Sequence, residues 1–214
     1  MAFRDIVLVG VPIEAGAGRR GCVMGPDAYR TAGLCETLRD LGYEVRDLGN
    51  LKPEPVAVLN AVEVDDEFHA RFSATGRHYL YKIIARRSPL TVDRGLAWRA
   101  SKPLDVAAMH EAGQALCGTH DFTTFRSAHC QAQSPVKSID TVTVSQADEI
   151  IRLEVSARSF LHNQVRSIAG SLKMVGEGAW TISRFKEALD AADRSKCGPV
   201  APPDGLYLVG VDYD

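Results

Sequence analysis

The segment "NLKPEP" at residues 50–55 constrains the fold of this chain more than any other stretch. Its two prolines, Pro53 and Pro55, lack a backbone N–H and disfavour both a helix interior and a central strand. The segment therefore predicts a linker. Because the sequence patterns differ on its two sides, we expect a short unit at residues 1–53 and a larger domain at residues 56–214.

The first unit has the pattern of a strand, a helix and a second strand. "DIVLVGV" (5–11) is an apolar strand, and "YEVRDLG" (43–49) is the second. Residues 24–42 between them predict one helix, since Pro26 suits a first turn and Gly42 suits a C-terminal cap. This order is typical of a short α/β unit with parallel strands.

The larger domain predicts an α+β fold, with an antiparallel-rich sheet and helices packed on it. Residues 150–157 alternate apolar and polar side chains, the period of a half-buried strand. Apolar residues from Leu161 to Val175 recur every three or four positions, which indicates an amphipathic helix at 160–178. The other expected elements are strands at 56–64, 78–87 and 205–213, a hairpin at 138–158, and helices at 104–118 and 182–194.

Cysteine usage and hydropathy exclude several classes of protein. The five cysteines are scattered and never in C-x-x-C spacing, which argues against a disulfide scaffold and a structural zinc site. The apolar runs are too short for a transmembrane helix, and the first residues lack a signal-peptide pattern. We therefore expect a cytoplasmic protein with reduced thiols, no membrane partner and no metal.

The charge distribution is more informative than the net charge of −2. Between residues 71 and 102, eight basic residues stand against the single acid Asp93. Such a cluster can follow the phosphates of a nucleic acid, although a solvated strand face would have the same composition.

"GAGRRG" at residues 16–21 matches the G-x-G-x-x-G pattern of dinucleotide-binding loops. In those loops the first glycine closes a strand and the third lies at the start of a helix. Here the first strand ends near Gly10 or Pro12, and the helix starts near Pro26. The context argues against a nicotinamide cofactor.

The stretch "VGVPIEAGAGRRGCVMGPDAYRTAGL" (9–34) resembles the amino-terminal end of the arginase and agmatinase ureohydrolases, and the resemblance covers residues 5–51. That family requires two manganese ions, held by histidines and by aspartates in D-x-H-x-D and D-x-D motifs. The only D-x-D here is at residues 212–214, without a histidine cluster. The resemblance therefore implies a ureohydrolase fragment without its metal ligands.

Four later stretches resemble the tRNA pseudouridine synthases of the TruA family, in order and spacing, from Val56 to Asp214. They are "DDEFHARFSATGRHYLYKI", "GTHDFTTFRSAHCQAQSPVKSI", "ARSFLHNQVRSIAGSL" and "APPDGLYLVGVDY". The resemblance implies a homodimer that isomerises uridine to pseudouridine in the anticodon stem-loop of tRNA, with no metal and no cofactor.

The resemblance also assigns roles to individual residues. Tyr79 corresponds to the active-site tyrosine that stacks on the target base, and Arg166 to the arginine that pairs with the catalytic aspartate; without the resemblance, Arg166 would be interpreted as a surface helix arginine. The residues in motifs that face RNA are Phe68, His69, Arg71, Arg77 and Arg126.

The catalytic aspartate of that family lies in a G-R-T-D-A-G-V-H motif, which this sequence lacks. Without an attacking carboxylate, covalent catalysis has no nucleophile. We therefore expect a hybrid chain, joined between Pro53 and Val56, that retains at most tRNA binding. The alternatives are a ureohydrolase, a non-catalytic RNA-binding module that uses the basic stretch at 71–102, and a hybrid without function.

Overall fold

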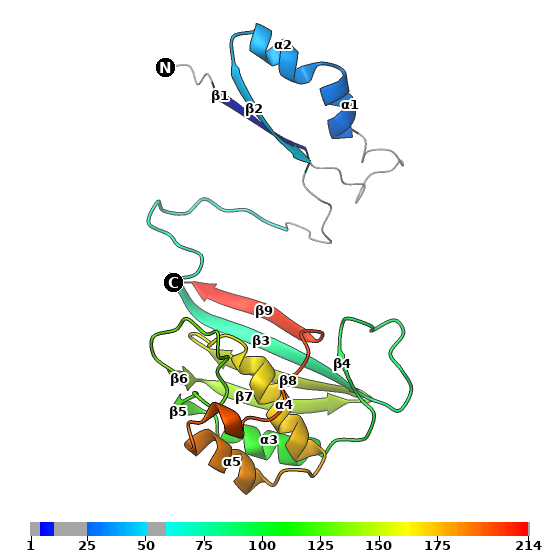
Figure 1. The fold of residues 1–214 in the computed structure, drawn as a ribbon, viewed down its shortest axis with the longest axis vertical. Helices are drawn as coiled ribbons and strands as arrows, with labels where there is room; N and C mark the ends of the chain where they lie inside the picture. The colour runs from blue at the N-terminus through cyan, green and yellow to red at the C-terminus, as the bar shows by residue number, and fades with distance from the viewer. Residues whose placement is uncertain (1–4, 11–24, 51–58, 214) are drawn as a thin grey trace. The chain divides into compact units, whose positions relative to one another are not determined.

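A computed structural model of the chain describes residues 5–10, 25–50 and 59–213. The chain divides into two compact units, Met1–Val64 and Asp65–Asp214 (Figure 1). The glycine-rich loop at residues 16–21 lies outside the described residues, as do residues 51–55 of the expected linker and residues 56–58 of the expected strand that follows it.

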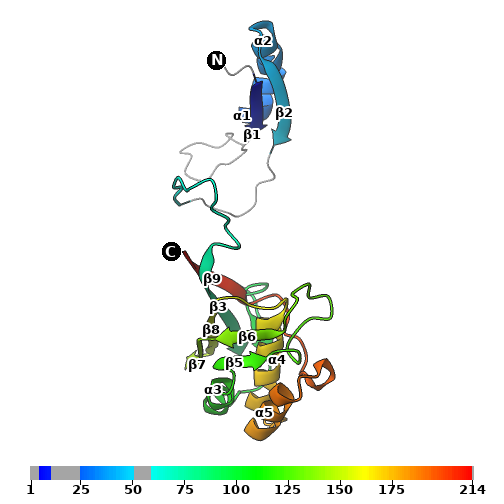
Figure 2. The ribbon, with the colours of Figure 1, turned by 90° about the vertical axis from the view of Figure 1, so that its left-hand side faces the viewer.

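Unit 1 contains two parallel strands, β1 (Asp5–Gly10) and β2 (Glu44–Asn50), as expected. The helices α1 (Gly25–Thr31) and α2 (Leu34–Asp40) lie over one face of this pair (Figures 1 and 2). The expectation of one continuous helix is wrong, because Gly33 adopts a left-handed conformation with φ 86° and breaks the segment in two.

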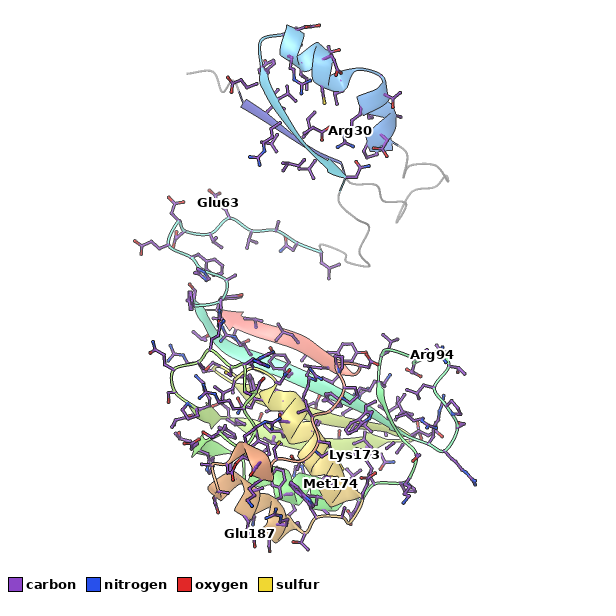
Figure 3. The ribbon with its side chains drawn as sticks, in the orientation of Figure 1. Arg30, Glu63, Arg94, Lys173, Met174 and Glu187 are labelled. Carbon is purple, nitrogen blue, oxygen red and sulfur yellow. The ribbon has the colours of Figure 1, made fainter. Side chains whose placement is uncertain are left out.

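The expected strand at 56–64 is also wrong over its described part. Residues 59–64, the segment that carries Glu63 in Figure 3, adopt no strand. Leu59 and Val62 are exposed. Apolar composition alone does not make a strand, because a strand needs a hydrogen-bonded neighbour. In the described residues, this segment pairs with neither β1 nor β2.

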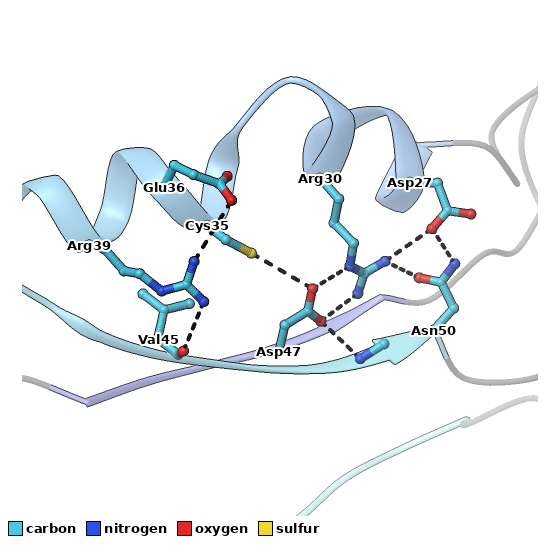
Figure 4. A network of polar contacts seen from close by, with 9 residues as sticks. Asp27, Arg30, Cys35, Glu36, Arg39, Val45, Asp47 and Asn50 are labelled. Atoms are coloured by element: carbon cyan, nitrogen blue, oxygen red, sulfur yellow. Dashed lines mark hydrogen bonds and ion pairs between the residues drawn. The ribbon is translucent and has the colours of Figure 1, made fainter.

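A polar network joins the helices of unit 1 to β2 (Figure 4). The Arg30 guanidinium donates two hydrogen bonds to Asp47, of 2.6 and 2.9 Å, and also contacts Asp27 and Asn50. These bonds from Arg30, together with the Gly49 N–H, lower the pKa of Asp47 to about 2. The carboxylate of β2 thereby holds α1 against the sheet.

Unit 2 is built on a five-stranded sheet in which the long strand β3 (Ala74–Ala85) has three neighbours. Along one edge, β3 pairs antiparallel with β8 (Ile150–Ala157), which in turn pairs with β7 (Thr141–Ala147). Along the other edge lie β9 (Leu206–Tyr213), antiparallel, and β4 (Trp98–Ala100), parallel. The sheet is thus rich in antiparallel pairs, which confirms the expected α+β class.

One face of this sheet is covered by helices. The helices are α3 (Val106–Gln114), α4 (Gln164–Gly176) and α5 (Ile182–Asp190), near their expected positions. Tyr81 and Ile83 of β3 and Leu153 of β8 are fully buried on this face. The residues between them, such as Lys82 and Glu154, face the opposite side of the sheet, which carries more polar side chains.

Four elements were not expected from the sequence. The strands β5 (Gly118–Asp121) and β6 (Val136–Ile139) form a separate antiparallel pair, and residues 194–196 form one turn of 3-10 helix. The strand β4 was also unexpected. Trp98 of β4 is covered by Lys173 of α4, whose Nζ lies 5.0 Å from the ring centroid.

Candidate RNA-binding site

Three adjoining pockets lie in unit 2, around the first half of β3 and the start of α4. The largest, of about 420 Å³, is the basic pocket, lined among others by Arg71, Arg77, Lys137 and Arg158. A pocket of about 350 Å³ is lined by both Tyr79 and Arg166. A third, of about 300 Å³, is lined by Phe68, Phe72 and Tyr213. The pockets share lining residues and therefore adjoin one another.

Tyr79 lies on the helix-covered face of β3 and is half-buried. Its ring meets Phe160 edge to face, with the centroids 5.1 Å apart and the planes at 90°. Edge-to-face packing fixes the orientation of an aromatic ring. Phe160 thereby positions Tyr79 in the pocket, where a flat ring can stack on any nucleobase.

Arg166 lies in the first turn of α4 and reaches the same pocket as Tyr79. Its Nε donates to the Ala201 carbonyl oxygen at 2.7 Å, and its Nη1 donates to Asn163 Oδ1 at 3.0 Å. The Ala201 N–H donates in return to the Arg166 carbonyl oxygen. Within residues 5–10, 25–50 and 59–213, no carboxylate lies within ion-pair distance of this guanidinium.

Tyr81 holds residues 201–205, the segment whose Ala201 binds Arg166, and the sequence analysis did not predict this role. Its hydroxyl donates to the carbonyl oxygens of Pro202 and Asp204 at 2.8 and 3.2 Å. Burial raises the pKa of Tyr81 far above its ordinary value, so the hydroxyl stays protonated. The motif "APPDG" at 201–205 marked this segment, but nothing in the sequence paired it with β3.

The turn at residues 65–73 presents Arg71 and Phe72 to the pockets. His69 Nδ1 accepts hydrogen bonds from the backbone N–H groups of Arg71 and Phe72, at 3.1 and 3.3 Å. The hydroxyl of Tyr213 donates to the Ala70 carbonyl oxygen at 2.9 Å, and its ring lies 5.0 Å from Phe68. His69 and Phe68 therefore shape the turn, which leaves the guanidinium of Arg71 over the exposed ring of Phe72.

Two of the expected RNA-facing arginines also hold backbone carbonyls. The Arg77 guanidinium donates to the carbonyl oxygens of Ala74, Arg71 and Arg158, and so ties the turn before β3 to the end of β8. Arg126 donates to the carbonyl oxygens of Cys130 and Ala132, both at 3.0 Å. Ala132 lines the basic pocket, so Arg126 shapes the wall of that pocket through this loop.

The basic stretch at 71–102 does not form one surface. Arg71 and Arg77 line the pockets, whereas Lys82 is paired with Asp93 at 2.8 Å and Arg86 with Glu149 at 3.7 Å. The charges available for binding come instead from several segments. Lys137, Arg158, Phe72 and Phe160 complete the site, and no short motif in the sequence brings them together.

The described part of the chain contains no cluster of three or more His, Cys, Asp or Glu side chains that could hold a metal ion. Among its helices, none has the length and apolar character needed to cross a membrane. Cys35, Cys117, Cys130 and Cys197 are free thiols.

Two family models match different parts of the chain. The tRNA pseudouridine synthase model matches residues 112–214, which include Arg166 and most of the helices and strands of unit 2. The arginase family model matches residues 4–84, which include unit 1 and the first strand of unit 2. The resemblances to both families, at opposite ends of the chain, are thereby confirmed.

Several bacterial proteins are similar over most of the chain. The tRNA pseudouridine synthase A of Maricaulis maris is 58% identical over 210 residues, which cover 96% of this chain and 84% of that protein. The corresponding protein of Parvibaculum lavamentivorans is 54% identical, with 94% and 79% covered. That of Sinorhizobium fredii is 60% identical over 163 residues, with 76% and 66% covered. The first two alignments must extend into unit 1, which the arginase family model also matches.

Proposed function

The chain belongs to the tRNA pseudouridine synthase A family, and from this premise we propose that unit 2 binds the anticodon stem-loop of tRNA and places a uridine on Tyr79 without isomerising it. The observation that carries the proposal is the pocket shared by Tyr79 and Arg166. It combines an aromatic ring for a base with a guanidinium, and its described lining contains no carboxylate.

The binding part of the proposal is supported by the chemistry of the three pockets. Tyr79, held by Phe160, offers a surface on which a base can stack. Arg71 and Arg158 add exposed guanidinium groups, which grip phosphate oxygens with two parallel hydrogen bonds. In this proposal, Phe68, His69, Arg77 and Arg126 contribute mainly by holding the backbone that presents those groups.

The proposed lack of isomerase activity is supported by the hydrogen-bond partners of Arg166. Isomerisation requires a group that attacks the nucleoside so that the base can detach and rejoin through carbon 5. In the described residues, the hydrogen-bond partners of Arg166 are an amide side chain and a backbone carbonyl. The sequence motif that would supply an aspartate is missing, so the pair of Tyr79 and Arg166 can bind a nucleotide but not attack it.

Binding of an anticodon stem-loop RNA to a filter tests the proposal. Since stacking on an aromatic side chain is worth about 1–3 kcal/mol per base, Tyr79→Ala weakens binding roughly 5- to 150-fold. Tyr29→Ala is the matched control, because Tyr29 is an exposed tyrosine of α1 in unit 1. Equal effects of the two substitutions, or no retention of RNA by the wild-type chain, contradict the proposal.

The arginase match at residues 4–84 favours one second candidate, a ureohydrolase fragment. We assign residues 1–53 to that fragment and residues 56–214 to the synthase-like domain. If the fragment bound manganese, Mn²⁺ would raise the melting temperature of the chain by mass action. We expect no shift, and a shift that saturates with Mn²⁺ supports the second candidate.

The family resemblance further leads us to propose a cytoplasmic homodimer. Sedimentation velocity at several protein concentrations tests the oligomeric state, and a single species with the mass of one 23.2 kDa chain contradicts it.

A further inference from the structure

The basic pocket gathers four cationic side chains from four separate segments. Arg71 lies in the turn before β3, Arg77 on β3, Lys137 on β6 and Arg158 just after β8. Its lining contains no aspartate or glutamate, and none of the four has an ion-pair partner within the described residues. On the opposite face of the sheet, by contrast, Lys82 and Arg86 are both paired with acids.

The arrangement is held in place by the protein itself. Arg77 is fixed by its hydrogen bonds to the carbonyl oxygens of Arg71 and Arg158, so it sets the positions of both neighbouring backbones. The side chains of Arg71 and Arg158 belong to exposed residues, and Lys137 is half-buried. Four like charges around one hollow repel one another, and an anion in the hollow relieves that repulsion.

The basic pocket also shares a wall with the pocket of Tyr79 and Arg166. Arg71, Tyr79 and Phe160 line both. A nucleotide whose base lies on Tyr79 is linked through its ribose to the phosphates on either side, and an adjoining basic hollow is where such a phosphate can be received. Phe72 and Tyr79 give the hollow aromatic edges against which the sugar can lie.

We propose that the basic pocket binds a backbone phosphate next to the nucleotide that lies on Tyr79, and that Lys137 and Arg158 are RNA-contacting residues. This inference rests on the proposed RNA binding by unit 2. The shared chemistry is a phosphate oxyanion, which could belong to RNA or to a free phosphate. Continuity with the base pocket favours the RNA backbone.

The salt dependence of RNA binding tests the proposal directly, because each phosphate contact steepens it. The dissociation constant of an anticodon stem-loop RNA is measured against salt for the wild type and for the double variant Lys137→Ala, Arg158→Ala. We expect the slope of log Kd against log salt to fall by about 1–2 and the affinity at low salt to fall about tenfold or more.

Lys186→Ala, Lys196→Ala is the matched control. It removes the same two charges from exposed residues of α5 and the 3-10 turn, outside all three pocket linings. The control keeps the wild-type slope. The phosphate site is overturned, and RNA binding by unit 2 is not, if the wild type and the Lys137, Arg158 variant have equal salt slopes. The same holds if the two double variants lose equal amounts of RNA affinity. No RNA binding by the wild type overturns both proposals.

Inorganic phosphate provides the arm that separates the two sources of the anion. At matched ionic strength, inorganic phosphate should displace RNA from the wild type more strongly than chloride, because free phosphate competes with the backbone phosphate for the pocket, and this excess should disappear in Lys137→Ala, Arg158→Ala. Binding of inorganic phosphate that depends on Lys137 and Arg158 but leaves the RNA affinity unchanged assigns the pocket to a free anion and overturns the assignment to the RNA backbone.

Discussion

Gly170 of α4 is the residue at which a single added carbon should damage the site most. The chain at Pro199–Ala201 passes directly over this glycine, and Ala201 holds Arg166 through two hydrogen bonds. A Cβ built on Gly170 would overlap the Pro199 carbonyl oxygen, and would lie 2.9 Å from its carbonyl carbon and 3.2 Å from the Ala201 nitrogen. These obstacles are backbone atoms, so no side-chain rotation can relieve the overlap.

The expected cost of Gly170→Ala follows from two effects. Overpacking costs about 1–3 kcal/mol, and displacing residues 199–201 weakens the two hydrogen bonds between Arg166 and Ala201, worth about 1 kcal/mol each. The higher helix propensity of alanine offsets about 1 kcal/mol. The net loss of about 2–4 kcal/mol lowers the melting temperature by roughly 5–15 °C.

Tryptophan fluorescence measures this loss for unit 2 alone, because the only two tryptophans, Trp98 and Trp180, lie there. Gly210→Ala of β9 is the control, since its Cβ would lie 3.2 Å from Cδ2 of His78, a partly exposed side chain that can shift. The control should change the stability by less than about 1 kcal/mol. If Gly170→Ala were as stable as the control, the contact of residues 199–201 with α4 would not hold Arg166 in place.

Three further predictions concern single polar groups. Arg30 and the Gly49 N–H lower the pKa of Asp47 from 3.8 to about 2. The ionised carboxylate therefore stabilises unit 1 fully above pH 4, and this stabilisation is lost as the pH falls towards 2. Hydrogen exchange of the β1 and β2 amides should become faster over this pH range, relative to its intrinsic rate, in the wild type and not in Asp47→Asn. Tyr81→Phe leaves the Pro202 and Asp204 carbonyls without their donor and should cost about 1–2 kcal/mol in urea unfolding, whereas an unchanged midpoint would contradict that role. Arg77→Lys keeps the charge but loses the planar, forked guanidinium that donates to three carbonyl oxygens. RNA affinity should therefore fall roughly tenfold with an unchanged salt slope, and an unchanged affinity would mean that only the charge of Arg77 matters.

The elements with a clear period were predictable from the sequence. The alternation of apolar and polar residues predicted β8, because every second side chain of a strand faces the covered side of its sheet. The spacing of apolar residues by three or four positions predicted α4, because such residues lie along one side of a helix. The apolar segment at 59–64 failed because strand formation depends on a neighbour that local sequence does not reveal. Gly33 broke the expected helix of unit 1 through a left-handed backbone that composition alone does not predict.

The residues of the site that lie in family motifs were predictable from the sequence. The residues that the fold brings together from distant segments were not. Tyr79 and Arg166 were expected to act together, and they do line one pocket. Lys137 and Arg158 reach the adjoining pocket from β6 and the end of β8, and neither carries a local signal. The anchoring hydrogen bonds of Arg77 were also unpredictable, since a basic residue in an RNA-like motif suggests a phosphate contact rather than a bond to backbone carbonyls.

The proposed function of this chain is to bind tRNA without isomerising a uridine. Tritium release from tRNA that carries uridine labelled at carbon 5 tests it most directly, because pseudouridine formation expels that hydrogen. We expect the wild-type chain to release no more tritium than the Tyr79→Phe, Arg166→Ala double variant, while it still retains tRNA on a filter at low salt. Release above that control would show that a carboxylate reaches the Tyr79 and Arg166 pocket and that the chain is an active synthase.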